Sequence, residues 1–109
     1  MEIPEKKLNE NEFYLRDIPT GGIRLIQFNS HRVAVYNVSG KFYATSEECT
    51  HAGGPLSEGV LKENEVVCPW HDSCFNVITG AVTCPPADEP LKTYQVIING
   101  DIGRIEIAS

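Results

Sequence analysis

Two short motifs carry side chains that could bind a transition metal. Cys49 and His51 are separated by one residue, Cys68 and His71 by two, and the sixteen residues 52–67 lie between the motifs. Zinc sites with two cysteines and two histidines usually pair like ligands, often as C-x-x-C, whereas each motif here supplies one ligand of each kind. This mixture favours a two-iron, two-sulfide cluster in which one iron binds both cysteines and the other binds both histidines. A zinc site with the same four ligands is the alternative.

The order C-x-H followed by C-x-x-H at this separation resembles the pattern of the Rieske family. The resemblance covers residues 42–94 and includes the run Gly53–Gly59 after the first motif and Phe75 after the second. It implies an all-β Rieske fold of stacked antiparallel sheets, with a cluster-binding subdomain inserted at about residues 45–87. It also implies that one 2Fe-2S cluster is bound by Cys49, His51, Cys68 and His71.

Further residues are assigned to the surroundings of this cluster. The pair Gly53-Gly54 permits a tight loop whose backbone N–H groups can approach sulfur. Trp70 lies between two ligands and is expected to pack beneath its loop as a large buried aromatic, with an electron relay as the alternative. By resemblance, Ser73 stands where high-potential members have a serine that bonds a bridging sulfide. The pair Pro85-Pro86 falls in a third loop that covers the cluster.

Neighbouring positions predict a reduction potential in the lower half of the Rieske range. Members with high potential have a tyrosine where this chain has Phe75, so one hydrogen bond to sulfur is lost. Asp72 replaces a glycine that is frequent in the family and adds a negative charge, which also lowers the potential. The alternative for Asp72 is an exposed carboxylate whose charge is screened by water and salt.

The other two cysteines lie on either side of a turn near Thr79. Cys74 and Cys84 are each five residues from Thr79, so a hairpin places them opposite each other. Because persistent disulfides are rare in a reducing compartment, we expect two packed free thiols. An oxidant-sensing role for the pair rests on their adjacency alone. His31 is expected to be a solvated turn residue without a role.

Alternating apolar residues predict short antiparallel strands on both sides of the motif segment. The segment 45–87 contains all four cysteines and several glycines and prolines, which indicates loops held together by something other than a core. The polar residues 1–12 are expected to be frayed or partly disordered. The predicted strands are residues 22–28, 32–38 and 94–98, with a closing hairpin of 93–98 and 102–108 that turns at Asn99-Gly100.

Length and charge restrict the function. The 109 residues predict one domain, 1–109, and the net charge of -6 argues against binding to nucleic acid. Apolar runs are far shorter than the ~18 residues of a membrane helix, and the first residues resemble no targeting signal. We therefore expect a cytoplasmic protein that does not bind membranes.

The resemblance implies a soluble Rieske ferredoxin, an electron carrier and not an enzyme, because oxygenases of this family add a domain with a mononuclear iron site. Its partners would be a flavin-dependent reductase and a terminal oxygenase or other redox enzyme, and it would be a monomer when free. Between Thr45 and Pro90 there are eight acidic residues against Lys62 alone, which predicts docking on basic patches. The alternative is the small subunit of an assimilatory nitrite reductase, bound to its large subunit.

Overall fold

The computed structural model describes residues 8–50, 53–70 and 72–107. These residues form ten strands and two short 3-10 helices, η1 and η2, in two antiparallel sheets. The larger sheet has the order β1-β10-β9-β4-β3-β2, and the smaller has the order β5-β6-β7-β8. The prediction of an all-β fold is confirmed. In the described part of the chain, no helix has the length and apolar character needed to cross a membrane.

The elements have the following bounds, in chain order: β1 Glu12–Tyr14, η1 Leu15–Asp17, β2 Ile23–Phe28, β3 His31–Val38, β4 Lys41–Ser46, η2 Leu56–Glu58, β5 Val60–Lys62, β6 Glu65–Val67, β7 Cys74–Asn76, β8 Val82–Cys84, β9 Thr93–Asn99 and β10 Ile102–Glu106. The strands predicted outside the motif segment are confirmed, including the closing hairpin of β9 and β10, although β10 ends at Glu106 and residue 108 of the predicted strand lies outside the described residues.

Two-residue turns set the register of the hairpins in the larger sheet. Asn29 and Ser30 connect β2 to β3 with φ values of 46° and 65°, and Ser39 and Gly40 connect β3 to β4 with φ values of 52° and 91°. A two-residue turn with two positive φ values matches the right-handed twist of the strands that it joins. The three strands are therefore held in fixed register, and β3 lies between its two neighbours.

The larger sheet is curled around an apolar core. Its two halves are joined where β4 pairs with β9 through the two residue pairs Ala44–Tyr94 and Thr45–Thr93. Side chains from both halves then meet in one cluster, which we call the base core. This arrangement agrees with the stacked antiparallel sheets that were predicted. The base core consists of Phe13, Ile18, Phe28, Val33, Val35, Ala44 and Ile105.

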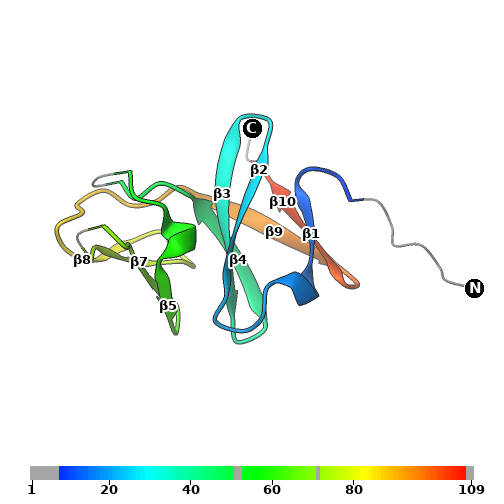
Figure 1. Cartoon of the computed structure of the whole chain (residues 1–109), viewed down its shortest axis with the longest axis horizontal. Helices are drawn as coiled ribbons and strands as arrows, with labels where there is room; N and C mark the ends of the chain where they lie inside the picture. The colour runs from blue at the N-terminus through cyan, green and yellow to red at the C-terminus, as the bar shows by residue number, and fades with distance from the viewer. Residues whose placement is uncertain (1–7, 51–52, 71, 108–109) are drawn as a thin grey trace, which may run out of the picture.

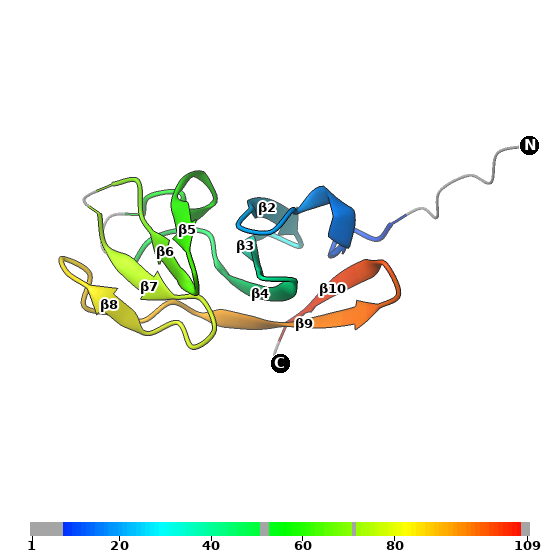
Figure 2. The same cartoon turned by 90° about the horizontal axis from the view of Figure 1, so that it is seen from below.

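The segment between β4 and β9 has a core, contrary to the prediction. Its strands β5 to β8 form the smaller sheet at one end of the molecule, as Figures 1 and 2 show. The opposite face of β3 contributes Ala34 and Tyr36 to this second cluster, because successive side chains of a strand point to opposite faces. We call it the junction core; it also contains Cys49, Leu56, Val66, Cys68, Phe75, Val77, Ala87 and Leu91.

Residues 9–12 are tied to the larger sheet, although fraying was expected there. The Asn11 side chain donates a hydrogen bond to the carbonyl of Ile105 at 3.0 Å, and the N–H of Ile105 donates to the carbonyl of Asn11 at 2.9 Å. These bonds extend the pairing of β1 with β10 by one residue. The predicted frayed segment also includes Leu8 and residues 1–7. Residues 1–7 lie outside the described residues.

A close contact between β10 and β1 provides a test of the base core. A Cβ atom added at Gly103 would lie 2.4 Å from Cζ of Phe13, the residue that pairs with Gly103 across the two strands. Since overpacking a core typically costs about 1–3 kcal/mol, Gly103→Ala should lower the free energy of unfolding in urea by that amount. Gly100→Asn is the control, because Gly100 has φ 66° in open space and asparagine tolerates positive φ. Equal stability of the two variants would contradict this account.

Candidate metal centre

The first motif lies in a loop that begins directly after β4. The N–H of Cys49 donates to the carbonyl of Gly54 at 2.8 Å, and the N–H of Gly53 donates to the carbonyl of Cys49 at 2.7 Å. Glu48 and Pro55 form an antiparallel bridge outside these bonds. The loop is therefore closed at its base by backbone pairing. His51, the predicted ligand within it, lies outside the described residues.

The second motif lies in the loop that connects β6 to β7. The N–H of Cys68 donates to the carbonyl of Ser73 at 2.8 Å, which closes this loop at its base. The N–H of Trp70 lies 3.4 Å from Sγ of Cys68 and donates to it. Asp72 has φ 59°, a left-handed conformation that glycine adopts easily and aspartate adopts more often than most residues. The second predicted histidine ligand, His71, lies outside the described residues.

Cys49 and Cys68 are free thiols buried together in the junction core. Burial raises the pKa of Cys68 to about 11; the N–H of Trp70 opposes this, and the neighbouring Cys49 thiol and the negative charge of Asp72 add to it. In the metal-free chain this thiol is therefore protonated at neutral pH. A metal must displace that proton to bind, so binding by this pair is favoured as the pH rises.

Gly54 leaves the space that the sulfur atom of Cys68 occupies. A Cβ atom at this position would lie 2.8 Å from Sγ of Cys68 and 3.0 Å from the ring of Trp70. The neighbouring Gly53 has φ 74° and no atom within 4 Å of an added Cβ atom. The two adjacent glycines thus have different roles, since Gly54 provides room beside a thiol and Gly53 allows the loop to turn.

The third loop runs between β8 and β9 and is tied to both motif loops. The hydroxyl of Thr50 donates to the carbonyl of Glu89 at 2.7 Å, and the N–H of Ala87 donates to Oγ of Ser73 at 3.1 Å. The peptide bond between Pro85 and Pro86 in this loop is cis. Because Oγ of Ser73 accepts a bond from the third loop, its own proton remains available to another acceptor.

Trp70 does not pack beneath its loop, so the prediction of a buried aromatic is wrong. Its side chain is 48% exposed, and its ring lies against the backbone of Gly54. The large apolar side chain that is buried near this loop is Phe75, which is 0% exposed and belongs to the junction core. Phe75 supplies the packing that was assigned to Trp70.

Sequence reasoning missed Glu47, a buried carboxylate that holds the first loop. Glu47 is 1% exposed, and its side chain accepts bonds from the N–H of Ser57 at 2.9 Å and from the hydroxyl of Ser57 at 2.5 Å. Its backbone carbonyl accepts a bond from the N–H of Leu56. Residues 47 and 56–57 are therefore fixed to each other on both sides of the loop. In the sequence, the pair Glu47-Glu48 is indistinguishable from surface charge.

Cys74 and Cys84 are joined by a disulfide, so the prediction of two free thiols is wrong. They are opposite residues of β7 and β8, as the predicted hairpin required, and their Cα atoms are 4.6 Å apart. That separation lies within the range that a disulfide spans.

His31, for which no role was predicted, packs its ring against Phe28 and Tyr94.

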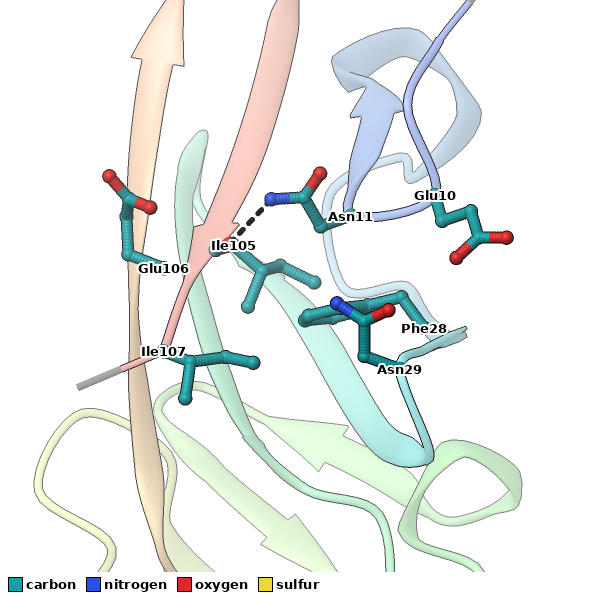
Figure 3. Close-up of a pocket in the computed structure, with 7 residues that line it drawn as sticks. All are labelled: Glu10, Asn11, Phe28, Asn29, Ile105, Glu106 and Ile107. Atoms are coloured by element: carbon teal, nitrogen blue, oxygen red, sulfur yellow. Dashed lines mark hydrogen bonds between the residues drawn. The ribbon is translucent and has the colours of Figure 1, made fainter. Parts of the chain in front are cut away.

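A separate pocket of about 320 Å³ lies on the larger sheet and is shown in Figure 3. It is bounded by the turn between β2 and β3, by the end of β10 and by residues 10–11. Its lining belongs to the base core side of the molecule and includes no residue of the three loops described above. The lining residues are Glu10, Asn11, Phe28, Asn29, Ile105, Glu106 and Ile107.

Comparisons with known proteins agree with this geometry. The family model described as Rieske [2Fe-2S] domain matches residues 12–95. The ferredoxin component of naphthalene 1,2-dioxygenase/salicylate 5-hydroxylase systems from Ralstonia sp is 40% identical over 84 residues, which is 77% of this chain and 81% of the relative. A chain in a solved complex of reduced oxygenase and oxidised ferredoxin in carbazole 1,9a-dioxygenase has a TM-score of 0.82 and 34% identity, over 85% of this chain and 96% of its own.

A further solved structure shares the fold alone. It is described as a nitrite reductase NADPH small subunit, and it aligns with 89% of this chain and 96% of its own length at a TM-score of 0.76 and 17% identity.

The glycine beside the Cys68 thiol gives a test of the metal centre. Gly54→Ala places a methyl group within 2.8 Å of that sulfur and should lower the iron bound per purified chain severalfold. Gly53→Asn is the matched control, because its position is open and asparagine tolerates a positive φ. Metal analysis and circular dichroism of both variants would check this. Full iron content in Gly54→Ala would contradict the proposed position of the metal.

Proposed function

The chain belongs to the Rieske [2Fe-2S] family, and from that premise we propose that it is a ferredoxin that carries one electron to a terminal oxygenase. The observation that carries this proposal is the match to a dioxygenase ferredoxin component over 81% of that relative's length. The arrangement of the site supports it, because two closed loops and a third loop surround a pair of buried thiols at one end of the molecule. The cytoplasmic location remains a prediction from the sequence.

The donor set suits the family's cluster. We assign Cys49 and Cys68 to one iron, and His51 and His71 to the other; the two histidines lie outside the described residues. Two observations support the thiol half of this assignment: both thiols are buried in the same core, and Gly54 leaves space beside the sulfur of Cys68. When bound, such a cluster supplies reversible one-electron chemistry.

The residues of the loops control the environment of the sulfur ligands. The junction core keeps water away from the thiols of Cys49 and Cys68. The N–H of Trp70 donates to the sulfur of Cys68 and stabilises negative charge there, whereas the carboxylate of Asp72 disfavours it. The half-exposed ring of Trp70 lies at the surface of the second loop, where a partner protein would approach.

The charge around the loops supports docking with basic partners. Glu47 is buried and does not belong to this surface, but several other acidic residues of the segment are exposed. We infer that they steer the protein to a flavin-dependent reductase and to the oxygenase, with complexes that weaken as salt increases. The exposed acidic residues are Glu58, Glu63, Asp72, Asp88 and Glu89.

The alternative of a nitrite reductase small subunit has weaker support. The solved structure of that description is 17% identical and shares the fold, whereas the dioxygenase ferredoxin component is 40% identical. Purification from the native host separates the two functions. A carrier should elute as a monomer, and a stable subunit should elute with a large chain that contains sirohaem.

Electron paramagnetic resonance tests the proposed function directly. The protein purified without air should give no signal when oxidised and a rhombic signal with a low average g value after dithionite, as expected for a cluster with mixed ligands. His51→Cys is a useful comparison, because a cluster with three cysteines and one histidine replaces a neutral nitrogen ligand with a thiolate and should raise the average g value. Silence in both states, with zinc in place of iron, would instead assign the four residues to a structural metal site.

Substitution of Asp72 separates charge from backbone conformation. Asp72→Asn keeps a side chain that tolerates φ 59° and removes the negative charge, so it should raise the reduction potential. Asp72→Gly removes the same charge and also relieves the backbone, and it should raise the potential by a similar amount. Protein-film voltammetry at low and high salt measures both. An unchanged potential in Asp72→Asn would show that solvent screens this carboxylate.

A further inference from the structure

The disulfide occupies the point where the second loop and the third loop meet. Cys74 directly follows Ser73, the last residue of the second loop, and Cys84 directly precedes Pro85, the first residue of the third loop. The two cysteines pair across β7 and β8 next to a register irregularity. The bridge therefore joins the base of a motif loop to the beginning of the loop that covers it.

Beyond the bridge, the third loop is held to the motif loops by two polar contacts among the described residues. The N–H of Ala87 bonds to the hydroxyl of Ser73, and the carbonyl of Glu89 accepts the bond from Thr50. Ala87 is only three residues after Cys84, so the bridge and the Ser73–Ala87 bond act on the same short segment. If the bridge opens, this bond loses the covalent constraint that keeps its two partners close.

We propose that the Cys74–Cys84 disulfide is a redox-controlled latch, which holds the third loop over the metal centre when oxidised and loosens that loop when reduced. The inference rests on the proposed function, because the loop covers a cluster only if one is bound. The disulfide would then be a second redox group besides the cluster. It consists of side chains of the protein itself and is separate from the four proposed ligands.

The structure favours Cys84 as the sulfur that a reductant attacks. Cys84 is half-buried between the exposed residues Thr83 and Pro85, whereas Cys74 is buried. A thiolate of a dithiol reductant attacks Sγ of Cys84, and the S–S bond breaks with Cys74 as the leaving group. The second thiol of the reductant then releases Cys84, so two electrons and two protons are transferred and the reductant becomes a disulfide. Sγ of Cys74 lies 3.5 Å from the carbonyl of Asp72, which can accept a hydrogen bond from the new thiol.

The redox state of the compartment should control whether such a bridge is closed or open. Disulfides persist in oxidising compartments and are rare where thiols are kept reduced, so in the cytoplasm that the sequence predicts this bridge would be formed and broken with the redox state around it. Opening it should leave the junction core in place, since that core contains neither Cys74 nor Cys84. The expected effect is therefore local, at the third loop, and not a loss of the fold.

The first measurement counts thiols in the purified protein. The protein is unfolded in acid with a chelator, and its thiols are then alkylated in a separate step. Mass spectrometry should find two modified cysteines in the sample without reductant. It should find four in the sample that was treated with a phosphine before alkylation. Four modified cysteines without reductant would overturn the proposal. This count does not depend on a bound cluster, so it can fail or succeed separately from the proposed function.

The second measurement follows the third loop and the cluster. Reduction should speed amide exchange in the peptide containing Ala87, and the loss of visible absorbance in excess chelator, by roughly tenfold, because the bridge holds Cys84, three residues before Ala87, beside Cys74. In Cys74→Ser, Cys84→Ser and the double variant, both rates should equal those of the reduced protein. The phosphine should not change them. An acceleration by phosphine in the double variant, or none in the natural protein, would overturn the latch. If no variant binds a cluster, the proposed function fails and amide exchange alone decides the latch.

Discussion

The thiols of Cys49 and Cys68 belong to the same apolar core that joins the two sheets, and this shared burial governs the rest of the site. Strand β3 contributes Val33 and Val35 to the base core and Ala34 and Tyr36 to the junction core, so it is buried on both faces. The position of the sulfur atoms is thereby linked to the packing of the whole chain. A metal bound to these thiols would stabilise the junction core, and a disturbed junction core would misplace the ligands.

Packing alone does not hold the loops, because their backbones carry polar groups that need partners. Each motif loop closes on itself through a hydrogen bond from its own cysteine N–H. Buried Glu47 then binds Ser57 across the first loop, while Thr50 and Ser73 bind the third loop. Among the described residues, every buried side-chain nitrogen and oxygen atom has a hydrogen-bond partner. A site arranged in this way needs little rearrangement when an electron arrives, which favours rapid transfer.

The sequence predicted four of the six strands of the larger sheet, β2, β3, β9 and β10, because their apolar residues alternate; it did not predict β1 and β4. It did not predict the smaller sheet as a folded unit, because β5 to β8 have three residues each and show no period. The burial of Glu47 and the exposure of Trp70 were not predicted for one reason, since each depends on contacts distant in sequence. For the disulfide, register placed Cys74 and Cys84 correctly, and the general rarity of disulfides in reducing compartments outweighed it. Spacing was enough to select the two cysteines that the structure brings together.

The pKa of Cys68 and the potential of a cluster bound at this sulfur respond to the same local electrostatics. Burial and the carboxylate of Asp72 both disfavour negative charge on the sulfur, and they raise the pKa of the thiol to about 11 against the opposing N–H of Trp70. An added electron also increases the negative charge at this point. The groups that favour a protonated thiol therefore favour the oxidised form of a cluster. Since burial is the largest of these contributions to the pKa, the junction core that positions the sulfur ligands is also the main group that disfavours negative charge on the sulfur of Cys68.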